Sequence, residues 1–336
     1  PVSVEVSRFT GSGGVSEFHI MARPKERANI GQQLRWLHLA YTALLRELGL
    51  PHSSAVLRRL FCSDLVNQVP ELRASEWCAT GEAPNLCALS LTDQAPAPPA
   101  KVALWAYHIA DPAGSLQRKR NAASFCLERG ELTHHWSTGL QDNTVSSSLD
   151  QTRKLFEGYS AVLERESLTL ADNVIRTWLY VRDIDSNYPG LVVARREHFA
   201  SKGLTPDTHF IASSGIGGGS SDPAASVTMD AYAIAGLQPG QVRYLSAPTR
   251  LGPTSAYGVT FERGTSVSYR DRKHIIISGT ASINPAGEIV HPGDLARQLE
   301  HTLENVEALL TSADATLADM NHFIVYVRDP TDHAWI

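Results

Sequence analysis

The chain has 336 residues, of which 43% are hydrophobic and 19% are charged, and its formal net charge is −5. This composition is typical of a folded protein with two or three domains. The acidic balance and the lack of a basic stripe argue against a nucleic-acid partner. No run approaches 18 apolar residues, so no membrane partner is expected.

The cysteines match no zinc-binding pattern and lie among apolar neighbours, which predicts buried free thiols and a reducing compartment. Since no charged-then-apolar leader begins the sequence either, we expect a cytoplasmic protein. The cysteines are Cys62, Cys78, Cys87 and Cys126.

Three segments of the chain read alike, beginning at Gln33, Gln151 and Gln298. In each, a Leu follows the Gln after 12 residues, and an Asp follows it after 31 or 32 residues. Two spacings kept in three places indicate an internal repeat. The leucines are Leu45, Leu163 and Leu310, and the aspartates are Asp64, Asp183 and Asp329.

Each repeat predicts a strand, an amphipathic helix and a second strand. In the first, a strand over 17–22 precedes a helix that starts near Gln33 and ends before Gly49, a natural C-cap, and a strand over 56–61 follows. The corresponding strands are 134–139 with 174–181, and 274–282 with 322–327. Strands joined by such a crossover helix are expected to be parallel.

Further elements follow the first two repeats. A second helix is predicted over 67–77 and 189–200, and strand pairs over 85–91 with 101–110 and over 208–216 with 225–234. Gln117–Arg120 is expected in a solvated loop, and the 236–258 segment in an ordered loop with a function. These elements predict three modules, at 1–112, 113–240 and 241–336.

The third module is shorter than the others, because the sequence ends seven residues after Asp329. By analogy with the first two modules, we expect about 40 further residues to belong to the native protein.

The stretches HIIISGTASIN from His274, GEIVHPGD from Gly287 and YVRD from Tyr326 resemble the Rid (YjgF-type) superfamily. The second module matches through Ser137–Gly139 and RTWLYVRD from Arg176. The resemblance implies an α/β (α+β) fold of three tandem β-α-β modules, with mixed sheets and helices on one face of each. Because Rid proteins form homotrimers with a site at each interface, it also implies an intramolecular pseudo-trimer, monomeric or further assembled.

The same resemblance implies an enamine or imine deaminase acting on a small carboxylated metabolite in a cleft between modules. The Ser-Gly strand end that lines the site in Rid deaminases corresponds here to Ser278, Gly279 and Thr280, and to Ser137 in the second module. The family's carboxylate-clamping Arg has no match on the strands over 85–91 and 208–216. Its catalytic acidic residue is expected beyond Ile336.

A second branch of this fold, the chorismatases, is also similar. The matching motifs are Arg176–Tyr180 (RTWLY), Gly215–Gly219 (GIGGG), Tyr257–Gly258 and Phe261–Arg263 (FER). They imply hydrolysis of chorismate to pyruvate and a cyclic acid. The sequence departs from that family at Ala194, where a Tyr is usual, and at 201–203. We therefore favour a Rid-type hydrolase, with a chorismatase-like enzyme or a non-catalytic binding or sensor protein as alternatives.

The residues alone indicate non-covalent chemistry, because no Ser-His-Asp or Cys-His arrangement is visible. We expect no metal and no cofactor. Arg263, Tyr257, Arg176 and Tyr180 are candidates to bind an anionic ligand, with backbone N–H groups near Ser278–Thr280 stabilising negative charge. The alternative interpretations are structural. They are an ion pair for Arg176, a buried phenol for Tyr257, and a flexible turn for the glycine run Gly215–Gly219.

Overall fold

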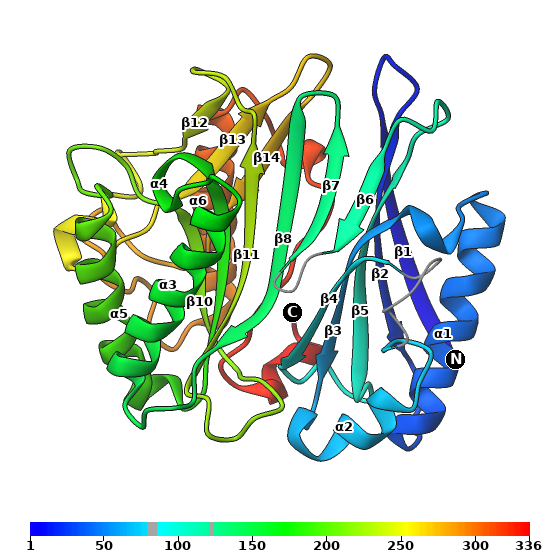
Figure 1. The fold of residues 1–336 in the computed structure, drawn as a ribbon. Coiled ribbons are helices and arrows are strands. Elements are labelled where there is room, and N and C mark those ends of the chain that lie inside the picture. Colours follow the sequence, from blue (N-terminus) through cyan, green and yellow to red (C-terminus); the bar gives the residue numbers. More distant parts are fainter. Residues whose placement is uncertain (79–85, 121–123) are drawn as a thin grey trace.

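The computed structural model describes residues 1–78, 86–120 and 124–336. The chain forms two large β-sheets that stand face to face, with helices on their outer sides and a smaller third sheet beside them (Figure 1). Within the described residues, no helix has the length and apolarity needed to cross a bilayer. Asn85, at the start of one predicted strand, lies outside these residues.

The first sheet has the order β1 (Val2–Thr10), β2 (Ser16–Pro24), β5 (Val102–Ala110), β3 (Ala55–Cys62), β4 (Ala88–Asp93). α1 (Ile30–Glu47) connects β2 to β3, and α2 (Leu65–Arg73) connects β3 to β4. Because β5 is antiparallel to both β2 and β3, the strands joined by α1 are parallel, as predicted. They are not adjacent, since the last strand lies between them.

The second sheet repeats this order with β7 (Phe125–Arg129), β8 (Leu132–Gln141), β11 (Val227–Ala235), β9 (Val174–Val181) and β10 (Ala212–Gly217). α3 (Ser148–Arg165) and the short α4 (Leu170–Asn173) connect β8 to β9, and α5 (Ile184–Ser201) connects β9 to β10. An additional strand, β6 (Gln117–Arg120), pairs with β7 at the edge. The prediction of a solvated loop at these four residues is therefore wrong, because they complete a hairpin.

The third sheet contains β12 (Val242–Tyr244), β13 (Gly264–Ser268) and β14 (Lys273–Ile277), and α6 (Leu295–Ser312) follows it. Short 3₁₀ turns lie at His52–Ser54, Thr254–Tyr257, Leu317–Asp319 and Pro330–Ala334. The chain is thus a mixed α+β protein with mixed sheets.

The predicted strand over 322–327 does not form, and the strand predicted over 274–282 ends at Ile277. In the first two sheets the corresponding third strand pairs with the last strand, β5 or β11. The described part of the third sheet has no counterpart of that last strand. The alternating pattern of 322–327 therefore has no neighbouring strand with which to pair, and Phe323 and Val325 are exposed.

α1 shows how the sequence sets a helix on a sheet. The side chain of Asn29 caps its start by accepting from the Gln32 N–H at 2.8 Å. Leu37 and Tyr41 lie in the buried apolar stripe that packs on the first sheet. The helix ends before Gly49, whose φ of +66° is the left-handed conformation predicted for a C-cap glycine.

The repeated Gln has a structural role that is the same in both large modules. The Gln33 amide donates to the carbonyls of Glu26 (2.9 Å) and Pro99 (3.1 Å) and accepts from the Lys101 N–H (2.7 Å). It thereby ties the start of α1 to the entry of β5. Gln151 ties α3 to the entry of β11 in the same way, through Val145 and Ala224 at 2.8 and 2.9 Å and the Ser226 N–H at 2.7 Å.

Gln298 keeps the first of these bonds, to the His291 carbonyl at 3.0 Å. The repeat detected from spacing is thus a repeat of hydrogen bonds.

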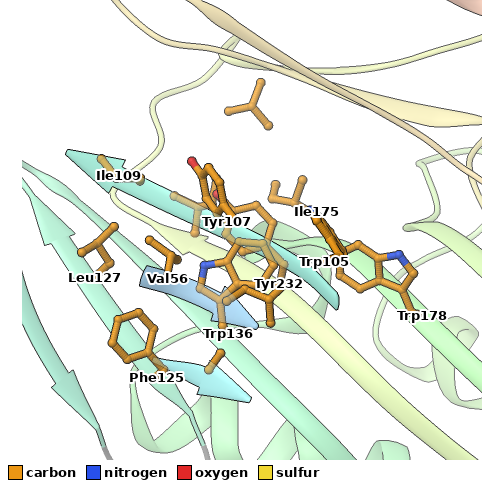
Figure 2. Close-up of a cluster of buried hydrophobic side chains, with 14 of the residues drawn as sticks. Val56, Trp105, Tyr107, Ile109, Phe125, Leu127, Trp136, Ile175, Trp178 and Tyr232 are labelled. Atoms are coloured by element: carbon orange, nitrogen blue, oxygen red, sulfur yellow. The ribbon is translucent and has the colours of Figure 1, made fainter. Parts of the chain in front are cut away.

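The faces of the first two sheets that point away from the helices form one aromatic core (Figure 2). Trp105 of β5 meets Trp178 of β9 with ring centroids 6.3 Å apart, and Trp136 stacks on Tyr232 at 4.2 Å. The two modules therefore share a core rather than merely touching. Three of the four free thiols, Cys62, Cys87 and Cys126, are buried as predicted, whereas Cys78 is only half-buried.

A buried carboxylate joins the first and third sheets. Glu17 of β2 accepts from the Tyr107 hydroxyl at 2.8 Å and from the guanidinium of Arg272, and it lies 2.9 Å from His274 Nε2. Burial alone would raise its pKa, but His274, Tyr107 and Arg272 lower the pKa of Glu17 to about 2. This group holds the β13–β14 hairpin against β2.

Replacing the glutamine that recurs in each repeat tests whether its hydrogen bonds stabilise the fold. We expect Gln33→Ala to lower the free energy of unfolding by about 2–4 kcal/mol, because two carbonyls and one N–H lose their buried partner. Gln298→Ala should cost less, since it breaks one bond. Urea unfolding followed by fluorescence measures both, with Gln32→Ala as the neighbouring control; equal losses in all three variants would contradict the assignment.

Acid should destabilise the protein from pH 6.5 downward. Burial lowers the pKa of His19 and of His108 from 6.5 to about 3, so the unfolded chain takes up these protons at a higher pH than the folded chain does. Stability is therefore lost as the pH falls below 6.5, at about 1.4 kcal/mol per pH unit for each group. Glu17 adds to the loss below pH 4.5. A thermal midpoint that stayed constant between pH 7 and 4.5 would refute this.

Candidate functional site

The candidate site lies where β10, the edge strand of the second sheet, meets the 261–263 and 278–280 segments that flank the third sheet. We call this contact the second seam. The Glu262 N–H donates to the Ile211 carbonyl at 3.1 Å, and the Gly279 N–H donates to the Ser213 carbonyl at 3.2 Å. Two modules are thus joined by backbone hydrogen bonds along the strand that carries the glycine motif.

Arg176, on β9, is buried at this seam. Its Nη2 donates to the Ser214 hydroxyl at 2.6 Å and its Nη1 to the Ser278 hydroxyl at 3.4 Å, while its Nε has no partner. The guanidinium carbon lies 5.1 Å from the centre of the Trp178 ring. Burial lowers the pKa of Arg176 to about 9. The structural interpretation of Arg176, as one half of an ion pair, is therefore wrong.

Ser278 connects the two sides of the seam. Its hydroxyl donates to the Glu262 carbonyl at 2.5 Å and accepts from the Ser213 N–H at 2.9 Å. The Ser278 and Gly279 N–H groups donate to the carbonyls of Arg263 (3.0 Å) and Ser213. Both are therefore occupied, which corrects the expectation that they stabilise charge on a ligand. The Thr280 hydroxyl donates to the Ser278 carbonyl at 3.0 Å.

Arg263 and Tyr257 lie together, as expected from their motifs. Arg263 donates to the Gly252 carbonyl at 2.8 Å, and its Nε has no partner. Its guanidinium stands 5.5 Å from the ring centres of Tyr257 and Phe261. Burial lowers the pKa of Arg263, with Tyr257 acting in the opposite direction. Gly287, at φ +81°, lies under this ring, where a Cβ atom would come within 2.6 Å of Tyr257.

Two further residues, Tyr188 and Arg195 of α5, belong to the site and were missed from the sequence. Arg195 is 1% exposed, its Nε donates to the Thr260 hydroxyl at 3.2 Å, and its Nη2 has no partner. Burial lowers its pKa, and Tyr188 opposes that shift. The two are seven positions apart, which places them on one helical face. That spacing is the signal in the sequence that identifies them.

The Tyr188 ring explains why glycine stands at the start of the Gly215–Gly219 motif. Gly215 lies within β10, where a Cβ atom would stand 2.8 Å from Cε2 of Tyr188. The prediction of a flexible turn is thus wrong for 215–217, which are strand residues. Glycine is needed there so that the Tyr188 ring can lie against the sheet edge.

The other two predicted residues lie elsewhere. Tyr180 is buried between the sheets, within reach of the charges of Arg59 and Asp230, and burial raises its pKa. Ser137 pairs with Ala231, whose side chain belongs to the core beneath α3 and α5. Ser137 therefore points to the face of the second sheet opposite to Arg176.

Buried positive charge is concentrated at the second seam. Across the parts of the chain that the structure describes, no ion pair involves Arg176, Arg195 or Arg263. Glu262 acts electrostatically on Arg263. Its carboxylate accepts from the Phe210 N–H at 2.7 Å, and burial raises its pKa. Burying unpaired guanidinium groups is costly, so this arrangement favours an anionic ligand.

Two hollows of the described surface lie away from this seam. One is lined by Ser160, Leu168 and Lys202, and the other by Asn29, Pro98 and Lys101. At the seam itself the arginines are buried, while Tyr188 and Tyr257 are half-buried and reach the surface. The Tyr257 ring thus lies beside the Arg263 guanidinium, and Tyr188 lies beside Arg195.

Comparison with known proteins supports the motif analysis. Residues 265–336 match the family model described as Endoribonuclease L-PSP. A chorismatase of Streptomyces rapamycinicus is 32% identical over 48% of this chain and 52% of its own length. The 3-aminoacrylate deaminase RutC of Acinetobacter baylyi is 30% identical over 18% of this chain and 47% of its own.

The resemblance to the Rid superfamily is confirmed. A RutC family protein of Haemophilus influenzae adds 39% identity over 18% of this chain and 45% of its own. The chain spans about half the length of the curated relatives it matches. The Rid-like match lies in the third module, whereas the chorismatase match extends over a much larger part.

A crystal structure of a chorismatase superposes with a TM-score of 0.62 and 16% identity, covering 100% of this chain and 88% of the other. At this identity the likeness establishes the fold. The α+β architecture with mixed sheets is therefore that of a Rid-like and chorismatase-like protein.

Removing the unpaired charge at Arg176 should stabilise the chain. We expect Arg176→Met to raise the free energy of unfolding by about 1–2 kcal/mol, because an apolar side chain of similar length avoids burying an uncompensated charge. Thermal unfolding without added anions measures the effect. A loss of stability comparable to that of a core truncation would show instead that Arg176 is a structural residue.

Proposed function

We propose that the second seam binds a small dicarboxylate and that the chain is a chorismatase-like hydrolase that cleaves an enolpyruvyl ether. One observation carries this proposal: the buried arginines Arg176, Arg195 and Arg263 lie along one seam, and none of them forms an ion pair within the parts of the chain that the structure describes. It reverses the ranking suggested by the sequence alone, where a Rid-type hydrolase came first.

The charge of the seam suits the substrate. Chorismate carries two carboxylates, one on the ring and one on the enolpyruvyl group. A guanidinium holds a carboxylate through parallel N–H donors, and such bonds are strong when buried. Arg195 and Arg263 each keep an unused N–H donor, so each can donate a hydrogen bond to one carboxylate oxygen.

The aromatic residues suit a ring-shaped ligand. Arg263 is fixed over Tyr257 and Phe261, which limits the orientations of its guanidinium. Tyr188 and Tyr257 are half-buried and present both a ring and a hydroxyl. Closure of these rings over a bound ligand would exclude bulk water from it.

The reaction itself needs a proton donor. Hydrolysis adds a proton to the terminal carbon of the enolpyruvyl double bond, and water then adds to the resulting cation. The C–O bond breaks, pyruvate leaves and the ring keeps a hydroxyl group. The arginines would bind the carboxylates, and a separate acid would supply the proton.

The proposed architecture is an intramolecular pseudo-trimer. The shared strand order of the first two sheets and the matching Gln33 and Gln151 bonds support two equivalent modules. The β13–β14 hairpin followed by α6 supports a third that begins in the same way. In this arrangement each seam corresponds to one subunit interface of a Rid trimer.

A Rid-type deaminase is the second candidate, favoured by the family match over 265–336. It would release ammonia from an imine or enamine rather than pyruvate from chorismate. Ligand binding without either product would indicate the third alternative, a sensor.

The test is to incubate the full chain with chorismate and follow pyruvate with a coupled lactate dehydrogenase assay. We expect Arg263→Ala and Arg195→Met each to lower kcat/KM about 30-fold or more, because each removes a buried partner of a substrate carboxylate. Arg196→Ala, which changes the exposed neighbour of Arg195, should leave turnover unchanged. Undiminished activity in Arg263→Ala would remove the second seam from the proposal.

A further inference from the structure

The first seam, where β4 of the first sheet meets β8 of the second, contains a complete carboxylate site. Asp230 of β11 is 2% exposed. Its Oδ2 accepts from Arg59 Nη2 at 2.8 Å and from the Ser90 hydroxyl at 2.5 Å, and its Oδ1 accepts from the Gly139 N–H at 2.8 Å. A cation, a hydroxyl and a backbone N–H thus surround one carboxylate.

The donors come from both modules. Arg59 lies on β3 and Ser90 on β4, whereas Gly139 lies on β8 and Asp230 on β11. Arg59 is enclosed by aromatic rings, with its guanidinium carbon 5.1 Å from the Trp105 ring centre and 4.6 Å from that of Trp178. Burial alone would lower its pKa, but neighbours including Asp230 raise the pKa of Arg59 above its usual value.

Both seams contain a serine hydroxyl bonded to a buried arginine, and they differ in whether a carboxylate joins this pair. Ser90 pairs in register with Arg59, and Ser214 pairs with Trp178 at the corresponding place in the second sheet. In both seams that serine hydroxyl contacts a buried arginine of the adjacent strand, at 3.2 Å for Arg59 Nε and 2.6 Å for Arg176. Within the described residues, a carboxylate of the chain bonds to this serine and arginine in the first seam alone.

We propose that Asp230 is a built-in ligand: its side chain occupies a carboxylate site at the first seam and so confines external carboxylates to the second. The chain therefore binds one anionic ligand rather than two. Removing the Asp230 side chain exposes a latent site for a small monocarboxylate such as formate, held by Arg59, Ser90 and the Gly139 N–H. The confinement to the second seam rests on the proposed function, whereas the latent site does not.

Chemical rescue tests the latent site. Asp230→Ala removes the carboxylate but leaves all three donors, so 200 mM sodium formate should raise the midpoint of thermal unfolding by about 3 °C or more above the change seen in the unaltered chain. Formamide, which has the same shape without the charge, should give no such rise. Sodium chloride at equal ionic strength controls for screening.

Two further variants decide the interpretation. Asp230→Asn fills the same space, so it should fold and show no added response to formate. Asp230→Ala with Arg59→Met should lose the response, because the cationic donor is gone.

An equal formate effect in all variants would overturn the proposal, and so would failure of Asp230→Ala to fold or gain stability at any formate concentration. If the unaltered chain does not turn over chorismate, the proposed function is overturned. The latent site is not, since formate rescue is measured by stability.

Discussion

The fold depends on placing charged side chains between sheets that are otherwise packed with aromatic rings. At the first seam Arg59 of one module meets Asp230 of the next, and both are hydrogen-bonded on several sides. Between the first and third sheets Glu17 plays the same part toward Arg272 and His274. Such pairs break at high cost once buried, so they fix which module packs against which.

The second seam departs from this rule, and the departure separates structural from functional arginines. Arg176, Arg195 and Arg263 are also buried, yet their hydrogen bonds and ring contacts are to hydroxyls, carbonyls and aromatic rings. Such an arrangement costs stability, as is expected of the anion site proposed at this seam. The uneven distribution of acids, more than the fold, points to one site.

Much of the fold could be predicted because the repeat is carried by local features. Gln33, Gln151 and Gln298 each lie in the first turn of a helix at a fixed distance from a buried Leu, and those spacings are visible in the linear sequence. The absent strand over 322–327 could not be foreseen, because its pattern is that of a strand and only the missing neighbour prevents pairing. The partnership of Arg59 with Asp230 was equally invisible, since 171 positions separate them. Motifs located Tyr257 and Arg263, whereas Tyr188 and Arg195 required the helix to be placed against β10.

The position of β5 and β11 has a consequence for how the chain acquires its shape. Each is the last strand of its sheet in sequence yet lies between two earlier ones, with Ala22 opposite Leu104 and Arg58 opposite Ala106. In the first sheet, the β1–β2 hairpin and the β3–α2–β4 unit therefore cannot pair through β5 until that strand has been synthesised. β5 then inserts between them. Assembly thus proceeds in whole modules, and slow closure of many-residue loops sets its pace.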